Sequence, residues 1–395
     1  MKKTHKITMT ETGTNDINNF TDDVLCHILS FLATKDAVAT SVLSKRFRSL
    51  WLYTPSINFT QSNEDIGSWV VYSVMRMKGL KLPLKRFCLK LNGPIYDADS
   101  FDISTWVNGA IQRRLEYLDL SLSLSLDINF PLGNIIHGSK TLVVLKLNKL
   151  KVDNVFIDGF PCLKTMHLDN VVFKQHKHLM HLLSGCPNLE ELHAIKPVTE
   201  DGYTFNADNE DFEFQSLHNL ALVTLSMADC IPMECIPQVK FLSFKEDFSF
   251  FQASPDYKFT CMFRNLSFLK FIVKVYNMNW FLQVLQHCPN LQSLVILKDA
   301  NVSDHYMDEN IDVKKWQPEL TPECLSTQLN LCSFQNFRGW KCELEFAKYI
   351  MKNAKVLQNM RISSHRSSKP QTKLEMVKKL SLCPKSSPTC ELSFE

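Results

Sequence analysis

Apolar positions begin to recur at helical spacing after residue 19, once a polar, aperiodic stretch has ended. Val24, Leu25, Ile28, Leu29 and Leu32 follow one another at steps of one, three or four residues. Residues at these steps share one side of an α-helix. The pattern therefore predicts a helix with a broad apolar stripe.

Two more short helices are predicted before residue 54. Thr34 can cap a helix in which Val38 and Val42 share a face, and Ser44 can cap a third helix that turns Trp51 inward. The connections are so short that the helices must pack tightly. A unit of fewer than about 40 residues rarely covers its own apolar surface. We expect another polypeptide to cover part of it.

A second pattern, L-x-x-L-x-L with substitutions, returns along the middle of the chain. Its first positions lie 21 to 31 residues apart, close to the repeat of about 20 to 29 residues in leucine-rich repeats. Each return predicts a short strand with alternate side chains inward, followed by a segment that leads back one layer. The returns begin at Leu84, Leu115, Leu142, Leu163, Leu189, Leu217, Val239, Leu266 and Leu291.

Two of the return segments have a helical pattern and nearly identical endings. Residues 178–183 and 280–285 each lead into Cys-Pro-Asn-Leu, where the proline forbids continuation of the helix. The shared ending supports true repetition. No regular Asn or Cys follows the third apolar position, so we expect an uneven solenoid without an unbroken asparagine ladder in its turns.

The residues that alternate with the inward positions should line the concave side of the stack. They mix aromatic side chains with single charges, which is typical of a protein-binding surface, although an ordinary solvated sheet face has a similar composition. The residues that we expect to contact a target are Tyr117, Lys146, His167, His193, Phe241, Phe268 and Lys270.

The segment 316–395 predicts one more strand-helix-strand layer. An apolar run at 329–334 is followed by a helix in which Leu344, Ala347, Ile350 and Met351 share a face. A strand closes the layer at 356–362. Such a layer suits a terminal cap on a stack of repeats.

The residues also resemble known families. Asp23-Val-Leu-Cys-His-Ile-Leu-Ser-Phe-Leu32, the run Thr34 to Arg46 and Leu50-Trp51 resemble a plant F-box. Trp316, Pro322-Glu-Cys-Leu325, Phe337-Arg-Gly339 and 343–350 resemble the FBD domain. With the repeats between them, nearly the whole chain resembles plant F-box/FBD/LRR-repeat proteins.

This resemblance implies that the N-terminal helices dock on a Skp-type adaptor of a cullin-RING ubiquitin ligase. The chain departs from the family at Thr21 and Ala33, where proline is usual. The resemblance implies that the residues that contact the adaptor are Phe20, Val24, Leu25, Ile28, Leu29, Leu32, Val38, Val42, Leu43 and Trp51.

Composition narrows the class of protein. Hydrophobic residues make up 45% and charged residues 22% of the 395 residues, as in globular chains, and the net charge of +3 does not argue for nucleic acid. The 13 cysteines are scattered, without a CxxC pair. We expect reduced thiols in an intracellular protein of the cytoplasm or nucleus, without a secretory signal or a membrane span.

No motif for nucleotide binding, zinc proteolysis or a nucleophile elbow occurs. The histidines at 176, 178 and 181 have no third local ligand, so we expect a polar helix face and no metal. The acidic segments 200–213 and 299–312 lack calcium-loop spacing and are predicted to be surface loops. We expect no cofactor and no enzymatic activity in the chain itself.

Together the patterns and the resemblance predict an α/β chain with four parts: a flexible tail (1–19), a three-helix F-box (20–60), an irregular leucine-rich-repeat solenoid (80–315) and an FBD-type cap (316–395). The resemblance favours a substrate-recognition subunit of an SCF-type ligase, which binds a Skp-type adaptor, through it a cullin, and an unknown target protein. A protein-binding scaffold that does not direct degradation is the alternative, and a small-ligand sensor ranks third.

Overall fold

The structure is a computed structural model. It describes residues 17–60, 68–79, 82–95, 97–124, 139–152, 159–200, 217–226, 231, 233, 236–245, 261–299, 316, 318, 320–366 and 370–395. The predicted tail before residue 17 and most of both acidic segments lie outside these ranges. Within them, no helix has the length and apolar character needed to cross a membrane.

The N-terminal helices are η1 (Ile17–Asn19), α1 (Asp22–Leu29), α2 (Thr34–Ala39), η2 (Thr40–Val42) and α3 (Phe47–Tyr53). The later helices are α4 (Ser68–Lys78), α5 (Asp97–Ile111), α7 (His176–Ser184), α9 (Met278–Gln286), α10 (Glu323–Thr327), α11 (Lys341–Asn353) and α12 (Pro370–Ser381). The strands are β1 (Ser56–Thr60), β2 (Arg86–Ile95), β3 (Tyr117–Leu124), β4 (Val144–Val152), β5 (Thr165–Phe173), β6 (Glu191–Ile195), β7 (Val198–Thr199), β8 (Leu222–Ser226), β9 (Phe241–Lys245), β10 (Phe268–Val273), β11 (Ser293–Lys298), β12 (Leu331–Phe337), β13 (Asn359–Ser364) and β14 (Glu391–Phe394).

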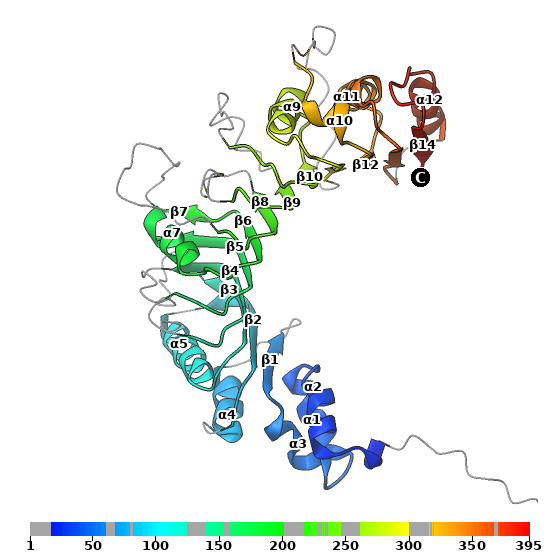
Figure 1. Ribbon diagram of the computed structural model, residues 1–395. Helices are drawn as coiled ribbons and strands as arrows, with labels where there is room; N and C mark the ends of the chain where they lie inside the picture. The colour runs from blue at the N-terminus through cyan, green and yellow to red at the C-terminus, as the bar shows by residue number, and fades with distance from the viewer. Residues whose placement is uncertain are drawn as a thin grey trace, which may run out of the picture.

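The described strands form one 14-stranded sheet in which neighbours pair in parallel and follow the order of the sequence, with β7 beside β5. The sheet bends into an arc. Strands line its inner side and helices such as α5, α7, α9 and α11 lie on its outer side (Figure 1). This arrangement fits the predicted solenoid.

Two inward rows of apolar side chains run along the sheet and form its core. Leu118 of β3 is in register with Leu145, which is in register with Met166, and the row continues through the later strands. These side chains are fully buried. The L-x-x-L-x-L pattern therefore predicted the core correctly in most repeats.

The repeat around β8 departs from the predicted register. Leu222 was expected to point inward as the third position of a motif that starts at Leu217. In the structure Val223 and Leu225 are buried in line with the preceding strand, and Leu222 is 40% exposed. The motif of this repeat starts at Leu220, three residues later, because burial of Val223 and Leu225 continues both inward rows.

The two predicted return helices are confirmed as α7 and α9. In the shared Cys-Pro-Asn-Leu endings, the thiols of Cys186 and Cys288 each donate to a carbonyl four residues earlier, at 3.1 Å in both. The asparagines also have equivalent partners, since Asn188 donates to Pro161 O and Asn290 to Arg264 O, both at 2.8 Å. The asparagine side chains thus link one repeat to the preceding one. The sequence pattern did not predict this partial row of hydrogen bonds.

The last layers continue the same sheet without a break. β12 pairs with β11, and the apolar face predicted for the following helix is buried in α11. Lys348 Nζ lies 2.7 Å from Glu345 Oε1, as their spacing suggests. The sequence predicted a single strand-helix-strand layer here, but α12 and β14 add a second layer.

The N-terminal helices are joined firmly to the sheet. Strand β1, which falls inside the segment assigned to the F-box, is the first strand of the sheet, and the Asn58 N–H at its edge donates to Thr34 Oγ1 at 2.8 Å. Ala37 and Trp51 are part of the same core as β1 and β2. Lys78 at the end of α4 donates to Trp51 O and Thr54 O, both at 2.8 Å. The sheet thus starts at residue 56, ahead of residue 80, where the repeats were expected to begin.

Candidate functional site

Helix α1 divides its apolar stripe between two directions. Leu25 and Leu29 are buried together with Phe47 in a small core between α1 and α3. Val24 and Ile28, one turn apart, point away from that core and are 41% and 44% exposed. The helix is held from one side by its own unit and offers a second apolar face to solvent.

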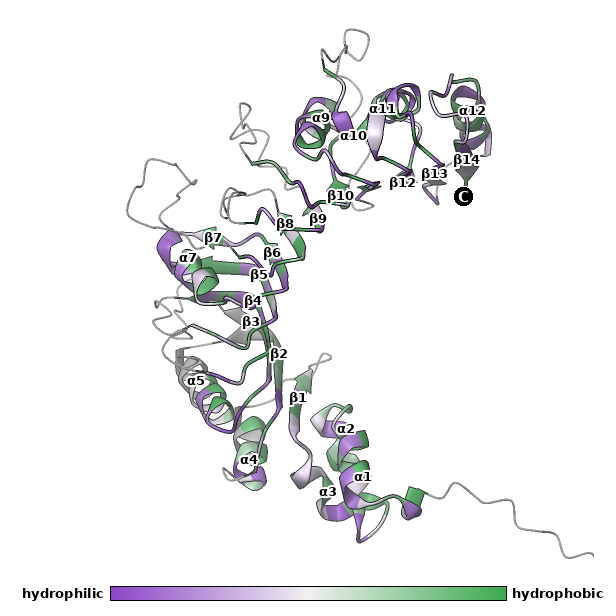
Figure 2. Cartoon of the chain, viewed as in Figure 1, coloured by the Kyte–Doolittle hydropathy of each residue, from purple (hydrophilic) through white to green (hydrophobic). Residues whose placement is uncertain are grey.

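The exposed apolar row extends beyond both ends of α1. Phe20 before the helix and Phe31 and Leu32 after it are exposed. Phe31 was not among the expected docking residues, although it follows Ile28 by three residues and its ring lies 4.9 Å from that of His27. Figure 2 shows hydrophobic residues on α1 and α2, the helices that precede β1 in the chain.

A second exposed apolar pair follows α2. Val42 is 85% exposed and Leu43 is 67% exposed, in and after η2. Val38 is partly buried against the solenoid core. We call Phe20, Val24, Ile28, Phe31, Leu32, Val42 and Leu43 the exposed helical face.

Four of the ten expected adaptor-binding residues lie outside the exposed helical face: Val38 is partly buried, and the other three are buried. Of these three, Leu25 and Leu29 belong to the small helical core, and Trp51 belongs to the core beside β1. The periodicity that predicted a stripe cannot tell which part of it faces the chain's own helices. These three are therefore reassigned as core residues, whose role is to hold the exposed face in shape.

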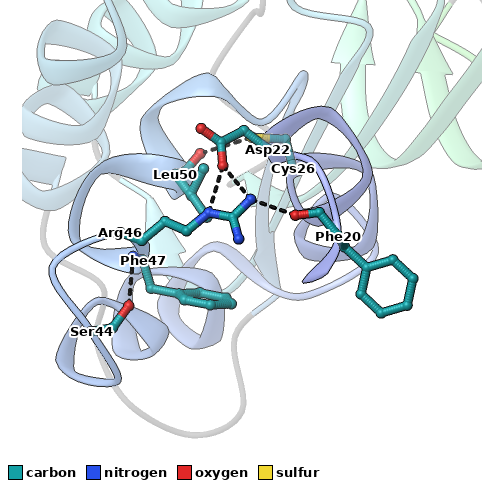
Figure 3. Close-up of polar contacts among 7 residues, drawn as sticks. All are labelled: Phe20, Asp22, Cys26, Ser44, Arg46, Phe47 and Leu50. Atoms are coloured by element: carbon teal, nitrogen blue, oxygen red, sulfur yellow. Dashed lines mark hydrogen bonds and ion pairs between the residues drawn. The ribbon is translucent and has the colours of Figure 1, made fainter. Parts of the chain in front are cut away.

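Arg46 connects α1 to the start of α3. Its Nε donates to Asp22 Oδ1 at 2.7 Å, and its Nη2 donates to Phe20 O (Figure 3). The ring of Phe20 points away from this group. Arg46 therefore fixes the backbone on which Phe20 is presented.

The backbone at the two departures from the family's prolines keeps a proline-like shape. Thr21 has a φ of −70° and Ala33 a φ of −60°. Both values lie within the range of about −65 ± 15° that a proline ring imposes. The helix starts are therefore built without the prolines.

The residues expected to contact a target lie at outward positions of the inner sheet side, in two groups. In the first group, the guanidinium of Arg86 lies 4.1 Å and the ammonium of Lys146 lies 5.9 Å from the centroid of the Tyr117 ring. Lys90 Nζ is 3.0 Å from Asp119 Oδ2. Burial and the neighbouring Asp119 raise the pKa of Tyr117 to about 12, so its hydroxyl stays neutral.

Two histidines continue this group on the next strands. The ring centroids of His167 and His193 are 5.1 Å apart, and His167 Nε2 lies 3.6 Å from Glu191 Oε1, too far for a hydrogen bond. Burial, and with it the charge of Lys146, lowers the pKa of both imidazoles. Both rings are therefore uncharged at neutral pH.

The second group is aromatic and apolar. The rings of Phe241 and Phe268 lie 5.9 Å apart on β9 and β10, and Lys270 shares the outward side of β10 with Phe268. Leu222 joins this group, because its neighbour Val223 takes the inward position. The sequence contained this signal in the spacing from Leu220 to Val223 and Leu225, which the starting point at Leu217 obscured.

Other candidates for chemistry are not brought together. In the ranges that the structure describes, no three His, Cys, Asp or Glu residues lie close enough to hold a metal ion. His178, expected on a polar helix face, is buried in α7. Burial raises the pKa of the Cys186 and Cys324 thiols to about 12, which leaves them protonated.

Comparisons with known families match these three regions. Family models for the F-box domain, for a leucine-rich repeat and for FBD match residues 17–57, 162–187 and 317–362. The chain is similar to plant F-box/FBD/LRR-repeat proteins. An F-box/FBD/LRR-repeat protein of Arabidopsis thaliana is 29% identical over 430 residues, covering 96% of this chain and 99% of the relative. Two FBD-associated F-box proteins of the same plant are 28% and 29% identical, covering 96% and 92% of this chain and 97% of each relative.

The matched ranges fall on definite parts of the fold. The F-box match holds the exposed helical face and ends inside β1, and the FBD match covers β12 and most of β13. The F-box match thus reaches the first strand of one continuous sheet, and the FBD match lies near its other end. The resemblance read from the sequence is confirmed.

Proposed function

We propose that the chain is a substrate-recognition subunit of an SCF-type cullin-RING ubiquitin ligase. Its F-box binds a Skp-type adaptor, and its repeats bind a target protein for ubiquitination and degradation. The observation that carries this proposal is the exposed helical face on an F-box whose own core is already complete. Burial of one large apolar side chain stabilises a complex by about 1.5–3 kcal/mol, so several such residues suffice for a stable contact.

The two surfaces have separate tasks in this proposal. The exposed helical face anchors the chain to the ligase, and the inner side of the sheet holds the target. Because β1 belongs both to the F-box match and to the sheet, the two surfaces keep a defined geometry. Holding the target near the ligase raises its effective concentration at the site of transfer. The chain supplies positioning, and its partners in the cytoplasm or nucleus perform the chemistry.

The proline-like φ at Thr21 and Ala33 supports adaptor binding over the alternative of a scaffold outside the ligase. The loss of both prolines is the sequence feature that favours such a scaffold. In the structure both positions have a φ that a proline would also adopt.

The test is co-purification of the full chain with a Skp-type adaptor. Ile28→Asp places a carboxylate in the middle of the exposed helical face. Desolvation of that carboxylate in a complex is expected to weaken binding about 100-fold. Binding is measured by calorimetry, and thermal unfolding checks that the variant is folded.

Leu222→Asp is the matched control. Leu222 is 40% exposed and Ile28 44%, and both lie away from the chain's cores, but Leu222 is on the inner side of the sheet. It should leave adaptor affinity unchanged. Equal adaptor affinity of the wild type and the folded Ile28→Asp variant would contradict the proposed docking surface.

A further inference from the structure

The inner side of the sheet changes character between β6 and β8. The outward positions of β2 to β6 carry both signs of charge in close contact, as in the Lys90–Asp119 pair and the His167–Glu191 contact. The cations there are engaged by neighbouring rings or carboxylates, as Arg86 is by Tyr117. This half of the surface is internally compensated.

The outward positions of β8 to β11 differ in composition. Their residues are Leu222, Thr224, Ser226, Phe241, Ser243, Lys245, Phe268, Lys270, Ile272, Ser293, Val295 and Leu297. No carboxylate is present at these twelve positions of the described strands. The charges are the two ammonium groups of Lys245 and Lys270.

Apolar residues surround these two charges in a defined order. In register across the sheet, Leu222, Phe241 and Phe268 form one row, and Ile272 and Leu297 form part of another. Lys270 lies in the middle row and Lys245 in the row of Ile272. Adjacent strands are about 4.8 Å apart, so the surface is about 14 Å wide from β8 to β11, the length of four to five extended residues.

We propose that this β8–β11 surface is the docking site for an extended segment of the target that carries acidic residues between aromatic or aliphatic ones. Apolar side chains of the segment cover Phe241 and its neighbours, and its carboxylates lie over Lys245 and Lys270. The argument is charge complementarity, because the surface has two cations and no anion at its outward positions. This inference rests on the proposed function, since it names the kind of target that the repeats receive.

The exposure of large apolar side chains on the β8–β11 surface supports the binding of a protein segment there. Phe241 is 46% exposed and Leu222 40% exposed, and they lie side by side on a sheet face that carries both apolar and polar side chains. Phe is among the aromatic residues that are enriched at protein–protein interfaces relative to the rest of the protein surface. A basic segment would instead face repulsion from both lysines.

The test uses a displayed library of randomised 12-residue peptides, selected against the full chain without adaptor. We expect the selected peptides to be enriched in Asp or Glu together with Phe, Tyr, Trp or Leu. Two variants then measure where they bind. Lys245→Glu with Lys270→Glu should weaken the selected acidic peptides about ten-fold, and Phe241→Ser by about the same factor.

The matched control lies on the outer side of the sheet. Lys177→Glu reverses one exposed charge on α7 and should leave affinity for the selected peptides within about two-fold, because it lies outside the β8–β11 surface. Weaker binding at high salt is also expected, since Lys245 is exposed and Lys270 is partly exposed to solvent.

Three outcomes of the peptide selection would overturn the proposal. These are failure to select any peptide, selection of basic peptides, and peptides whose binding survives both β8–β11 variants. Dimers of the chain that disappear in Phe241→Ser would show that a second copy covers the surface, which also overturns it. Adaptor co-purification is measured in parallel on the same variants, so failure here stays distinct from failure of the proposed function.

Discussion

At the scale of single residues, burial separates side chains that the sequence pattern groups together. Leu25 and Ile28 belong to one predicted stripe, but the first is 1% and the second 44% exposed. A stripe wider than one neighbouring helix can cover leaves some of its members exposed. Some ionisable side chains are also buried, and the clearest case is Glu343.

Glu343 gives a prediction on pH. Its side chain is fully buried and its Oε2 accepts from the backbone N–H groups of Arg338 and Trp340, both at 3.0 Å. Burial raises the pKa of this carboxyl to about 7, and the same two N–H groups and the charge of Lys298 oppose that rise. Gly339, with a φ of +79°, forms the turn between the two donors.

The sign of the effect follows from the two states. Between pH 4.5 and 7 the unfolded chain has released this proton and the folded chain still holds it, so stability falls as pH rises. Below pH 4.5 the penalty is absent, and above pH 7 it is complete, on the order of 3 kcal/mol.

Glu343→Gln keeps an acceptor oxygen but cannot ionise. We expect urea unfolding of this variant to depend less on pH between 5 and 8, with a gain in stability at pH 8 relative to the wild type. Identical pH profiles of the two proteins would show that Glu343 carries no such penalty.

At the scale of elements, the repeat register around β8 shows where a pattern fails. The sequence placed Leu222 inward, and the structure places Val223 there instead. Two leucines in the preceding segment, Leu217 and Leu220, both fit the start of a motif, and both are buried. Only pairing with the neighbouring strand decides between them.

This register predicts that two adjacent substitutions destabilise the chain to very different extents. Val223→Asp puts a carboxylate into the core and should destabilise the chain by at least about 3 kcal/mol, whereas Leu222→Asp should change stability by less than about 1 kcal/mol. Chemical denaturation of both variants measures the difference. A larger destabilisation by Leu222→Asp than by Val223→Asp would instead support the register in which the motif starts at Leu217.

Much of the fold followed from sequence patterns, for reasons visible in individual elements. Rows such as Leu118, Leu145 and Met166 recur because each strand fills the same place in the core. Helices α4 and α5 were not predicted, since they lie in return segments without the Cys-Pro-Asn-Leu ending. The partners of Arg46 depend on contacts between α1 and α3, which no local pattern contains.

At the scale of the whole molecule, the chain is one sheet with different elements at its two ends. The F-box match lies at the start of the sheet, and the FBD match covers β12 and most of β13, one layer before the end of the sheet. Family boundaries therefore mark sequence similarity rather than separate bodies. The exposed helical face and the β8–β11 surface lie on different strands and helices of this single unit, so both can be occupied at once.

The most direct test of the central claim is amide hydrogen exchange of the full chain with and without a Skp-type adaptor. The account predicts slower exchange over residues 17–32 and 40–43 in the complex, and unchanged exchange over 222–226, 241–245 and 268–273. Absence of binding, or protection of the β8–β10 strands in place of the F-box helices, would contradict it.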